Sequence, residues 1–176
     1  EVYHFSAHSL LSSALAAWPE VPNVLLREHY RCHPKIIEFC NQRFYDGELI
    51  TMTSDKNEDN VLQVIKTVPG NHARGHFNQR EIDVISQEVL PECTNSESIG
   101  IITPYRSQAE AINQILKKDI ASTVHKYQGR ECDTIIMSMV DNVPTVFSDD
   151  ANLLNVAISR AKTRLCIVTN GNEMPP

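Results

Sequence analysis

Four consecutive residues carry the side chains of this chain best suited to holding a ligand: Gln128-Gly129-Arg130-Glu131. Gln128 offers a neutral hydrogen-bonding amide, Arg130 a cation and Glu131 an anion. Gly129 lets the backbone approach a bound group closely. The apolar run 134–140 follows directly and is typical of a buried strand. The four residues predict a ligand-facing loop, although a polar surface turn fits the spacing equally well.

The elements that position this loop alternate between strands and helices. Short apolar runs predict strands at 61–68, 99–103, 134–140 and 165–169, and a short apolar segment precedes them at 24–26. Apolar residues spaced three and four apart predict helices at 9–18, 34–44, 78–89, 107–118 and 153–161. Continuous apolar strands between helices are typical of an α/β fold, with a mostly parallel sheet and helices on both faces.

Three groups of polar residues follow predicted strands: Tyr30 with Arg31, Thr103 to Arg106, and Gln128 to Glu131. In open parallel sheets, ligands bind beyond the carboxyl ends of the strands. We therefore expect the three groups to converge at that edge of the sheet and to form one site.

The composition bounds the class of protein. With 176 residues, 41% of them hydrophobic, the chain fits one globular domain with a full core. No apolar run is long enough to span a membrane and no signal-peptide pattern opens the chain, so we expect a cytoplasmic protein without a membrane partner. Five cysteines without a CxxC pair predict reduced thiols. The absence of an initiator methionine predicts a segment of a longer protein.

The net charge of −6 bears on nucleic-acid binding. Phosphate contacts supply most of the affinity of nucleic-acid-binding proteins, which therefore usually carry a basic excess. The acidic balance argues against tight binding by the isolated chain. It is compatible with a local basic groove or with a site completed by another domain.

Histidine spacing raises the question of a metal. Two H-x-x-x-H pairs have the spacing of zinc ligands on a helix, namely His29 with His33 and His72 with His76. Pro34 places the first pair before its helix, and Gly75 weakens a helix at the second. We therefore predict no metal site.

Four segments in order resemble the second, C-terminal RecA-like domain of superfamily 1 helicases. They are LREHYRCHPKIIEFCNQRFYDGELI, IGIITPYRSQ, STVHKYQGRECDTIIMSMV and LNVAISRAKTRLCIV, which span about residues 25 to 169. They are similar to the YRxHP, ITPYxxQ, QGxExD and LNVAxSRAK blocks of the branch with the nonsense-mediated-decay helicase and the replication nuclease-helicases. The resemblance implies one RecA-like domain over residues 1–176, with its core at 24–170.

The resemblance implies an ATP site with Mg²⁺ between this domain and an N-terminal RecA-like domain. By match, Arg31 and Arg160 reach the γ-phosphate, where permanently charged guanidinium groups stabilise the transferring phosphoryl group. The other matched residues are Tyr30 against the adenine, Gln128 and Gly129 near the γ-phosphate, and Glu131 at the ribose. Without the resemblance, Arg160 fits a surface arginine and Tyr30 a core tyrosine. Arg130 is left to pair with phosphate or with Glu131.

The resemblance also implies single-stranded DNA or RNA on the opposite rim. The matched residues are Thr103, Pro104 and Tyr105 in one loop, and Thr123 and His125 in another. Hydroxyl and backbone N–H groups hold phosphates without reading sequence, and an aromatic ring stacks on any base. Simple packing is the alternative for Tyr105.

No G-x-x-x-x-G-K-[ST] phosphate-binding loop occurs in the chain. We therefore expect these residues alone neither to hydrolyse ATP nor to unwind a duplex. The implied function is that of the second motor domain of an ATP-dependent helicase or translocase. A non-catalytic nucleic-acid-binding or protein-interaction module that keeps the fold is the alternative.

Overall fold

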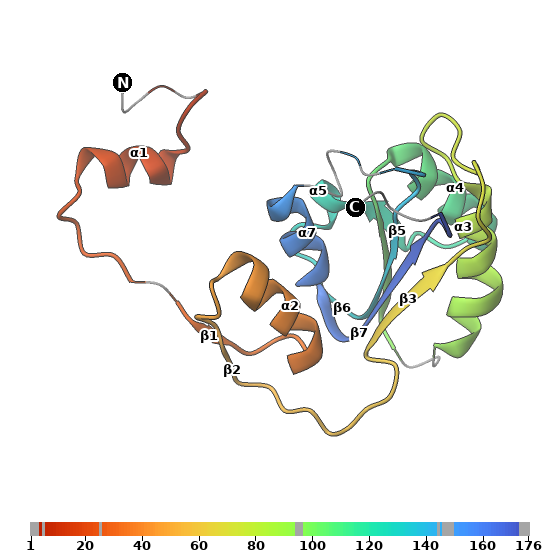
Figure 1. The fold of residues 1–176 in the computed structure, drawn as a ribbon, viewed down its shortest axis with the longest axis horizontal. Helices are drawn as coiled ribbons and strands as arrows, with labels where there is room; N and C mark the ends of the chain where they lie inside the picture. The colour runs from red at the N-terminus through yellow and green to blue at the C-terminus, as the bar shows by residue number, and fades with distance from the viewer. Residues whose placement is uncertain are drawn as a thin grey trace.

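A computed structural model describes residues 4, 6–24, 26–93, 97–143, 145 and 150–172. Its centre is a five-stranded parallel sheet in the order β3-β7-β6-β4-β5 (Figure 1). The strands are β3 (Leu62–Lys66), β4 (Ile99–Thr103), β5 (Ala121–Thr123), β6 (Cys132–Ser138) and β7 (Ala161–Thr169). The predicted parallel α/β sheet is confirmed.

Burial explains why the central strands are continuous apolar runs. Ile135, Ile136 and Met137 of β6 are all buried, because helices cover both faces of this strand. The edge strand β3 instead alternates between exposed and half-buried residues. The buried centre of the sheet therefore runs through β4, β6 and β7, and several candidate site residues lie at the ends of these strands.

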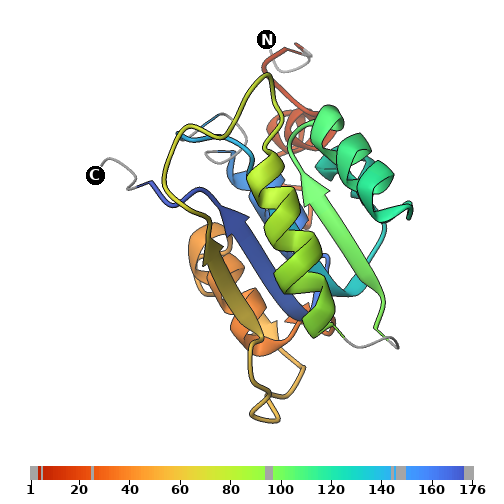
Figure 2. The ribbon, with the colours of Figure 1, turned by 90° about the vertical axis from the view of Figure 1, so that its right-hand side faces the viewer.

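Two helical layers sandwich the sheet. One layer holds α2 (Pro34–Phe44), the single turn α5 (Val124–Tyr127) and α7 (Ala151–Ile158). The other holds α4 (Arg106–Leu116) and α3 (Gln79–Val84), which continues as the π-helical turn η1 (Ile85–Val89) and the 3₁₀ turn η2 (Leu90–Glu92). Figure 2 shows α3 and α4 in front of the sheet, with the β3–α3 connection extending past the strand ends.

The N-terminal part lies outside this core. Helix α1 (Leu10–Ala17), capped by Ser9, stands apart from the sheet in Figure 1. The prediction of a core from residue 24 is wrong, because the side chains of Val24 and Leu26 are 83% and 86% exposed. The buried core of the described residues begins at Cys32.

The chain enters the core through a second, small sheet. Strand β1 (Glu28–His29) pairs in parallel with β2 (Ile50–Thr51) and does not join the main sheet. Tyr30 and Arg31 therefore follow a strand of this small sheet, which places them beside the main one. None of the helices in the described residues is both long and apolar enough to cross a membrane.

Candidate functional site

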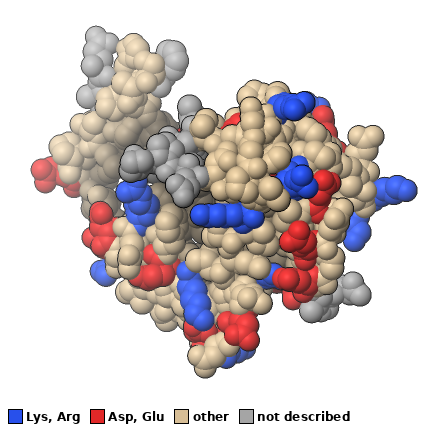
Figure 3. Space-filling view, turned by 45° about the vertical axis from the view of Figure 1, so that its right-hand side comes forward, with Lys and Arg blue, Asp and Glu red and all other residues tan. Residues whose placement is uncertain are grey.

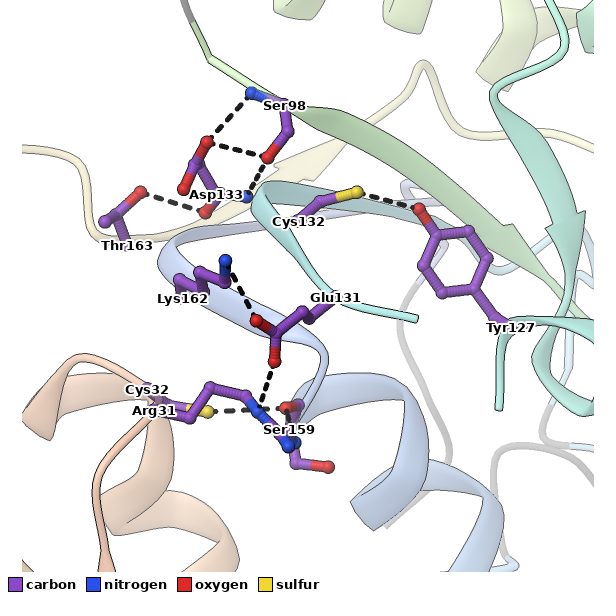
Figure 4. A network of polar contacts seen from close by, with 10 residues as sticks. All are labelled: Arg31, Cys32, Ser98, Tyr127, Glu131, Cys132, Asp133, Ser159, Lys162 and Thr163. Carbon is purple, nitrogen blue, oxygen red and sulfur yellow. Dashed lines mark hydrogen bonds and ion pairs between the residues drawn. The ribbon is translucent and has the colours of Figure 1, made fainter. Parts of the chain in front are cut away.

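Glu131 is the centre of a charged cluster at the amino edge of the sheet (Figure 4). Its two carboxylate oxygens contact Arg31 Nε at 2.7 Å and Lys162 Nζ at 2.9 Å. The hydrogen bond from Lys162 and the nearby Arg31 charge lower the pKa of Glu131, so the carboxylate is ionised at neutral pH. Lys162 was not among the residues predicted from the sequence. Its position in the LNVAISRAK segment is the signal that could have identified it.

Strand register brings Arg160 beside this cluster. Cys132 of β6 pairs with Ala161 of β7, so the residues that precede them, Glu131 and Arg160, lie at the same level. A hydrogen bond of 3.1 Å from the Cys132 N–H to the Arg160 carbonyl fixes this level. The chain therefore places an anion and a cation side by side where two neighbouring strands begin.

Two guanidinium groups converge on Ser159. Arg31 donates from Nη1 to the Ser159 carbonyl at 3.4 Å, and Arg160 donates from Nη2 to its hydroxyl at 3.4 Å. Arg160 also donates from Nε to the Val156 carbonyl at 3.0 Å, which caps the end of α7. Burial and the Arg31 charge lower the pKa of Arg160, but a guanidinium stays charged in proteins. Both arginines keep donors for a ligand.

An open pocket of about 500 Å³ adjoins the cluster, and its lining residues are Glu28, His29, Tyr30, Arg31, Glu131 and Lys162. Tyr30 is 65% exposed, and its hydroxyl donates to the Glu28 carboxylate. The alternative of a core tyrosine is therefore wrong. The pocket offers two cations, two carboxylates and an exposed ring, which are groups that suit a polar, anionic ligand.

The loop 128–131 has the shape that its glycine requires. Gly129 has a φ of +83°, and a Cβ atom at this position would meet no atom within 4 Å. Any other residue would be strained there, and the backbone is open to an approaching ligand. Arg130 lies over the Tyr127 ring at 5.0 Å, whereas the partners of Glu131 are Arg31 and Lys162. Gln128 is exposed beside this loop.

The prediction that all the polar groups share the carboxyl edge is wrong. After β5 the single turn α5 carries the chain back across the sheet, so Gln128 to Glu131 precede β6 instead of extending β5. Thr103 to Arg106 do follow the carboxyl end of β4. The sheet thus separates the candidate residues into two sites at opposite ends, about 20 Å apart along seven residues of β6.

Tyr105 is a half-buried aromatic residue at the carboxyl edge. Its hydroxyl donates to Asp141 Oδ2 at 2.7 Å, and burial together with this bond raises the pKa of Tyr105 to about 12. The His76 ring lies against the Tyr105 ring, with centroids 3.9 Å apart and planes tilted by 32°. Pro104 is half-buried beside it. An aromatic pair is therefore available here for stacking.

The other residues that were predicted to contact nucleic acid differ in their exposure to solvent. Thr103 is fully buried, and its hydroxyl has no hydrogen-bond partner among the described residues. The Thr103 side chain is therefore not accessible to a nucleic-acid strand, and only a backbone contact of this residue remains as the prediction. Thr123 is half-buried at the end of β5, and His125 is exposed on α5. Because Thr123 pairs with Thr103 across β5 and β4, Thr123 lies at the same edge of the sheet as the loop of Tyr105.

A buried polar network supports the carboxyl edge from below. Glu81 is fully buried; it accepts from the Ser138 hydroxyl at 2.6 Å and from the Val140 N–H at 3.0 and 3.1 Å. Val140 has a φ of +69°, which is strained for a β-branched residue. Burial raises the pKa of Glu81 to about 7, and the Asp141 charge adds to this. The network holds the chain that leads into Asp141.

One group of side chains has the ligand types of a metal site. His33 Nε2 lies 3.3 Å from both Asp55 Oδ1 and Glu58 Oε2. However, His33 Nδ1 accepts from the Lys35 N–H at 3.1 Å, so the neutral ring carries its proton on Nε2. This proton points to the carboxylates and occupies the position that a metal would need. His29 Nε2 likewise accepts from the Cys32 N–H at 3.0 Å.

Comparisons with known proteins point to helicases. The family model described as AAA domain matches residues 6–172. The 5′-3′ DNA helicase ZGRF1 of Mus musculus is 31% identical over 167 residues, which cover 82% of this chain and 9% of that protein. An uncharacterised ATP-dependent helicase of Methanocaldococcus jannaschii is 28% identical over 192 residues, covering 93% of this chain and 29% of that protein. The chain spans less than a third of the length of these relatives.

Among solved structures, the C-terminal domain of a possible DNA helicase from Lactobacillus plantarum matches with a TM-score of 0.57. It is 18% identical, and the match covers 83% of this chain and 90% of that domain. This likeness shows the RecA-like α/β fold. Because the family model covers nearly the whole chain, the protein belongs to the AAA domain family and is a helicase domain of the superfamily 1 type.

Proposed function

We propose that this chain is the second motor domain of an ATP-dependent superfamily 1 helicase or translocase. Its amino edge supplies Arg31 and Arg160 to ATP bound with Mg²⁺ between this domain and an N-terminal RecA-like domain. Its carboxyl edge holds single-stranded DNA or RNA. The observation that carries the proposal is the convergence of both guanidinium groups on Ser159, beside the open pocket.

The chemistry of the amino edge is electrostatic. A transferring γ-phosphoryl group spreads negative charge over its oxygens, and guanidinium groups stabilise that charge without giving up a proton. The pair Arg31–Glu131 is 40% and 41% exposed, so it contributes little stability. Arg31 can therefore exchange Glu131 for a phosphate oxygen at small cost. Lys162 keeps Glu131 paired during that exchange.

Mg²⁺, when bound, would supply positive charge that neutralises part of the charge on the phosphates. Both carboxylates that line the pocket at the amino edge already have partners: Glu131 contacts Arg31 and Lys162, and Glu28 accepts from the Tyr30 hydroxyl. No phosphate-binding loop sequence occurs in the chain. The carboxylate that holds the metal is therefore assigned to the N-terminal RecA-like domain. The present chain would contribute Arg31 and Arg160, and its Tyr30 would stack on the adenine.

Movement follows from the segment that joins the two edges. Thr123 and His125 lie near the carboxyl edge, and the same segment continues to Glu131 at the amino edge. A shift of residues 128–131 on ATP binding would move Thr123 and His125, because only about eight residues separate Thr123 from Glu131. The contacts of these two residues with the nucleic acid would then change. Domain closure with ATP and opening after hydrolysis would then move the strand stepwise.

The test is ATP hydrolysis by the intact protein and by residues 1–176, each with and without single-stranded DNA or RNA. We expect strand-stimulated turnover by the intact protein and none by residues 1–176, because half of the nucleotide site is absent from this sequence. Stoichiometric turnover by residues 1–176 would refute the split site.

A non-catalytic binding module is the second candidate, favoured by the net charge of −6 and the missing phosphate-binding loop. It predicts a folded intact protein that binds a strand but hydrolyses no ATP. The presence of Arg31 and Arg160 in one cluster argues against it, because a binding module needs no paired guanidinium groups there.

A further inference from the structure

The connection between β3 and α3 forms a small β-hairpin at the carboxyl edge. Arg74 and Phe77 exchange backbone hydrogen bonds of 2.8 and 3.2 Å, and Ala73 bridges Asn78 in antiparallel fashion. Between them, Gly75 and His76 have φ values of +56° and +66°. Two central residues with positive φ define a tight turn of type I′, which glycine favours and histidine tolerates.

This hairpin, residues 73–78, is anchored to the buried network. The Asn78 N–H donates to Gln108 Oε1 at 2.9 Å, and Asn78 Nδ2 donates to the Val140 carbonyl at 2.9 Å. Ser107 Oγ donates to the His76 carbonyl at 2.9 Å, which ties the hairpin tip to α4. The tip is therefore held in place before any ligand arrives, despite its strained backbone.

The anchoring gives His76 a fixed position on Tyr105. The His76 side chain is exposed, and the two ring centroids are 3.9 Å apart. Asp141 holds the other side of the pair through the Tyr105 hydroxyl. The exposed His76 ring, which lies against the half-buried Tyr105 ring, gives a base a stacking platform that does not depend on the identity of the base.

Two arginines beside the platform have no partner among the residues described. Arg74 and Arg80 line a pocket of about 360 Å³ together with Asn71, His72, Phe77, Gln79 and Asp83. The Asp83 carboxylate faces the same pocket but accepts from Gln79 Nε2 at 2.8 Å. In contrast, Arg106 and Arg164 both have carboxylate partners. A pocket with two unpaired guanidinium groups suits a phosphodiester.

The charge distribution makes such local groups necessary. On the face drawn in Figure 3, basic and acidic side chains are interspersed, and the chain carries a net charge of −6. The face in Figure 3 therefore offers no broad basic field to a polyanion. Strand binding must come from particular unpaired cations next to a stacking surface.

We infer that the hairpin is an additional element that binds single-stranded nucleic acid. A base stacks on the His76–Tyr105 pair, and Arg74 and Arg80 hold the neighbouring phosphate. The inference rests on the proposed function, because its ligand is the single strand of that function. It extends the strand surface from the loop after β4 to the β3–α3 connection. Since no contact reads a base edge, the element binds without sequence preference.

The test measures binding of fluorescein-labelled oligo(dT) and oligo(U) to the intact protein, without nucleotide, at several salt concentrations. For the double variant Arg74→Ala with Arg80→Ala we expect about tenfold weaker binding. The slope of the logarithm of the binding constant against the logarithm of the salt concentration should be shallower by about 1.4, because two phosphate contacts are lost. For His76→Ala we expect roughly tenfold weaker binding, which His76→Phe restores. Strand-independent ATP hydrolysis should stay unchanged in these variants, and the melting temperature should stay unchanged in the double arginine variant.

The matched control is Arg43→Ala, which removes an exposed arginine from α2 on the other face of the sheet. Wild-type affinity and salt slope in the double variant would overturn the inference while leaving the proposed function intact. An equal loss in the Arg43 control would also overturn it, because the effect would then follow net charge alone. An unsubstituted protein that binds neither oligomer would contradict the proposed function and the inference together.

Discussion

The two edges of the sheet are built in opposite ways. The amino edge is open and charged: Arg31, Glu131 and Lys162 form exposed ion pairs around a wide pocket. The carboxyl edge rests on a buried network, in which Glu81 holds the strained Val140. One edge consists of groups that can change partners, and the other of groups whose positions are fixed.

This difference matches what each proposed ligand needs. A nucleotide between two domains binds and leaves in every cycle, so its cations should exchange partners at small cost, and surface ion pairs contribute only about 0–1 kcal/mol. A strand surface must present rings and cations in one geometry, because ordering them on binding would reduce affinity. Buried hydrogen bonds below Tyr105 provide that rigidity.

Removal of an arginine from the amino edge should change activity most. Arg160→Ala in the intact protein should lower strand-stimulated ATP hydrolysis by about a thousandfold or more, as the loss of an arginine finger does. The fold should persist, because Arg160 is only partly buried and caps the last turn of α7. Circular dichroism and turnover measured on the same sample check this. Near-normal turnover would contradict the assignment.

Removal of the buried Glu81 carboxylate from the carboxyl edge should lower the free energy of unfolding. Glu81→Ala leaves the Ser138 hydroxyl and the Val140 N–H without their acceptor in a buried site. We expect unfolding to require about 2–4 kcal/mol less, measured by urea titration at pH 6. Glu110→Ala on the exposed face of α4 is the matched control, with an expected change below about 0.5 kcal/mol. Equal stability of the two variants would show that the network is not rigid.

The stability of the carboxyl edge should also depend on pH. The pKa of Glu81 is about 7 in the folded protein and 4.5 without its surroundings, so the folded state holds this proton more tightly. Stability should therefore fall as pH rises from about 4.5 to about 7, by an amount on the order of 3 kcal/mol. Glu81→Gln should flatten this part of the profile. An unchanged slope in that variant would mean that another group titrates.

The fold could be predicted because strands that are buried on both faces consist of apolar residues, which the sequence shows directly. Strands β4 and β6 are covered on both faces, so their residues are continuously apolar, and a parallel sheet follows. The helix cap at Asn78 was also predictable, since its side chain accepts from the Glu81 N–H. The Glu81 side chain, however, goes to Ser138 and Val140, which lie more than fifty residues away.

The site could be predicted only in part. Arg31, Arg160 and Glu131 were found through their segments, but one helical turn after β5 decided on which edge Glu131 lies. Four residues of helix leave too weak a pattern to be read among polar residues. The His76 tip was missed because only the type I′ turn brings it onto Tyr105, and Gly-His is a weak signal for that turn.

The separation of the two edges is tested most directly by strand affinity without nucleotide in Tyr105→Ala and Arg160→Ala of the intact protein. We expect about tenfold weaker binding for Tyr105→Ala and unchanged binding for Arg160→Ala, because only the carboxyl edge contacts the nucleic acid in the proposed function. Equal losses in both variants, with both proteins folded, would contradict it and place nucleotide and strand at one shared site.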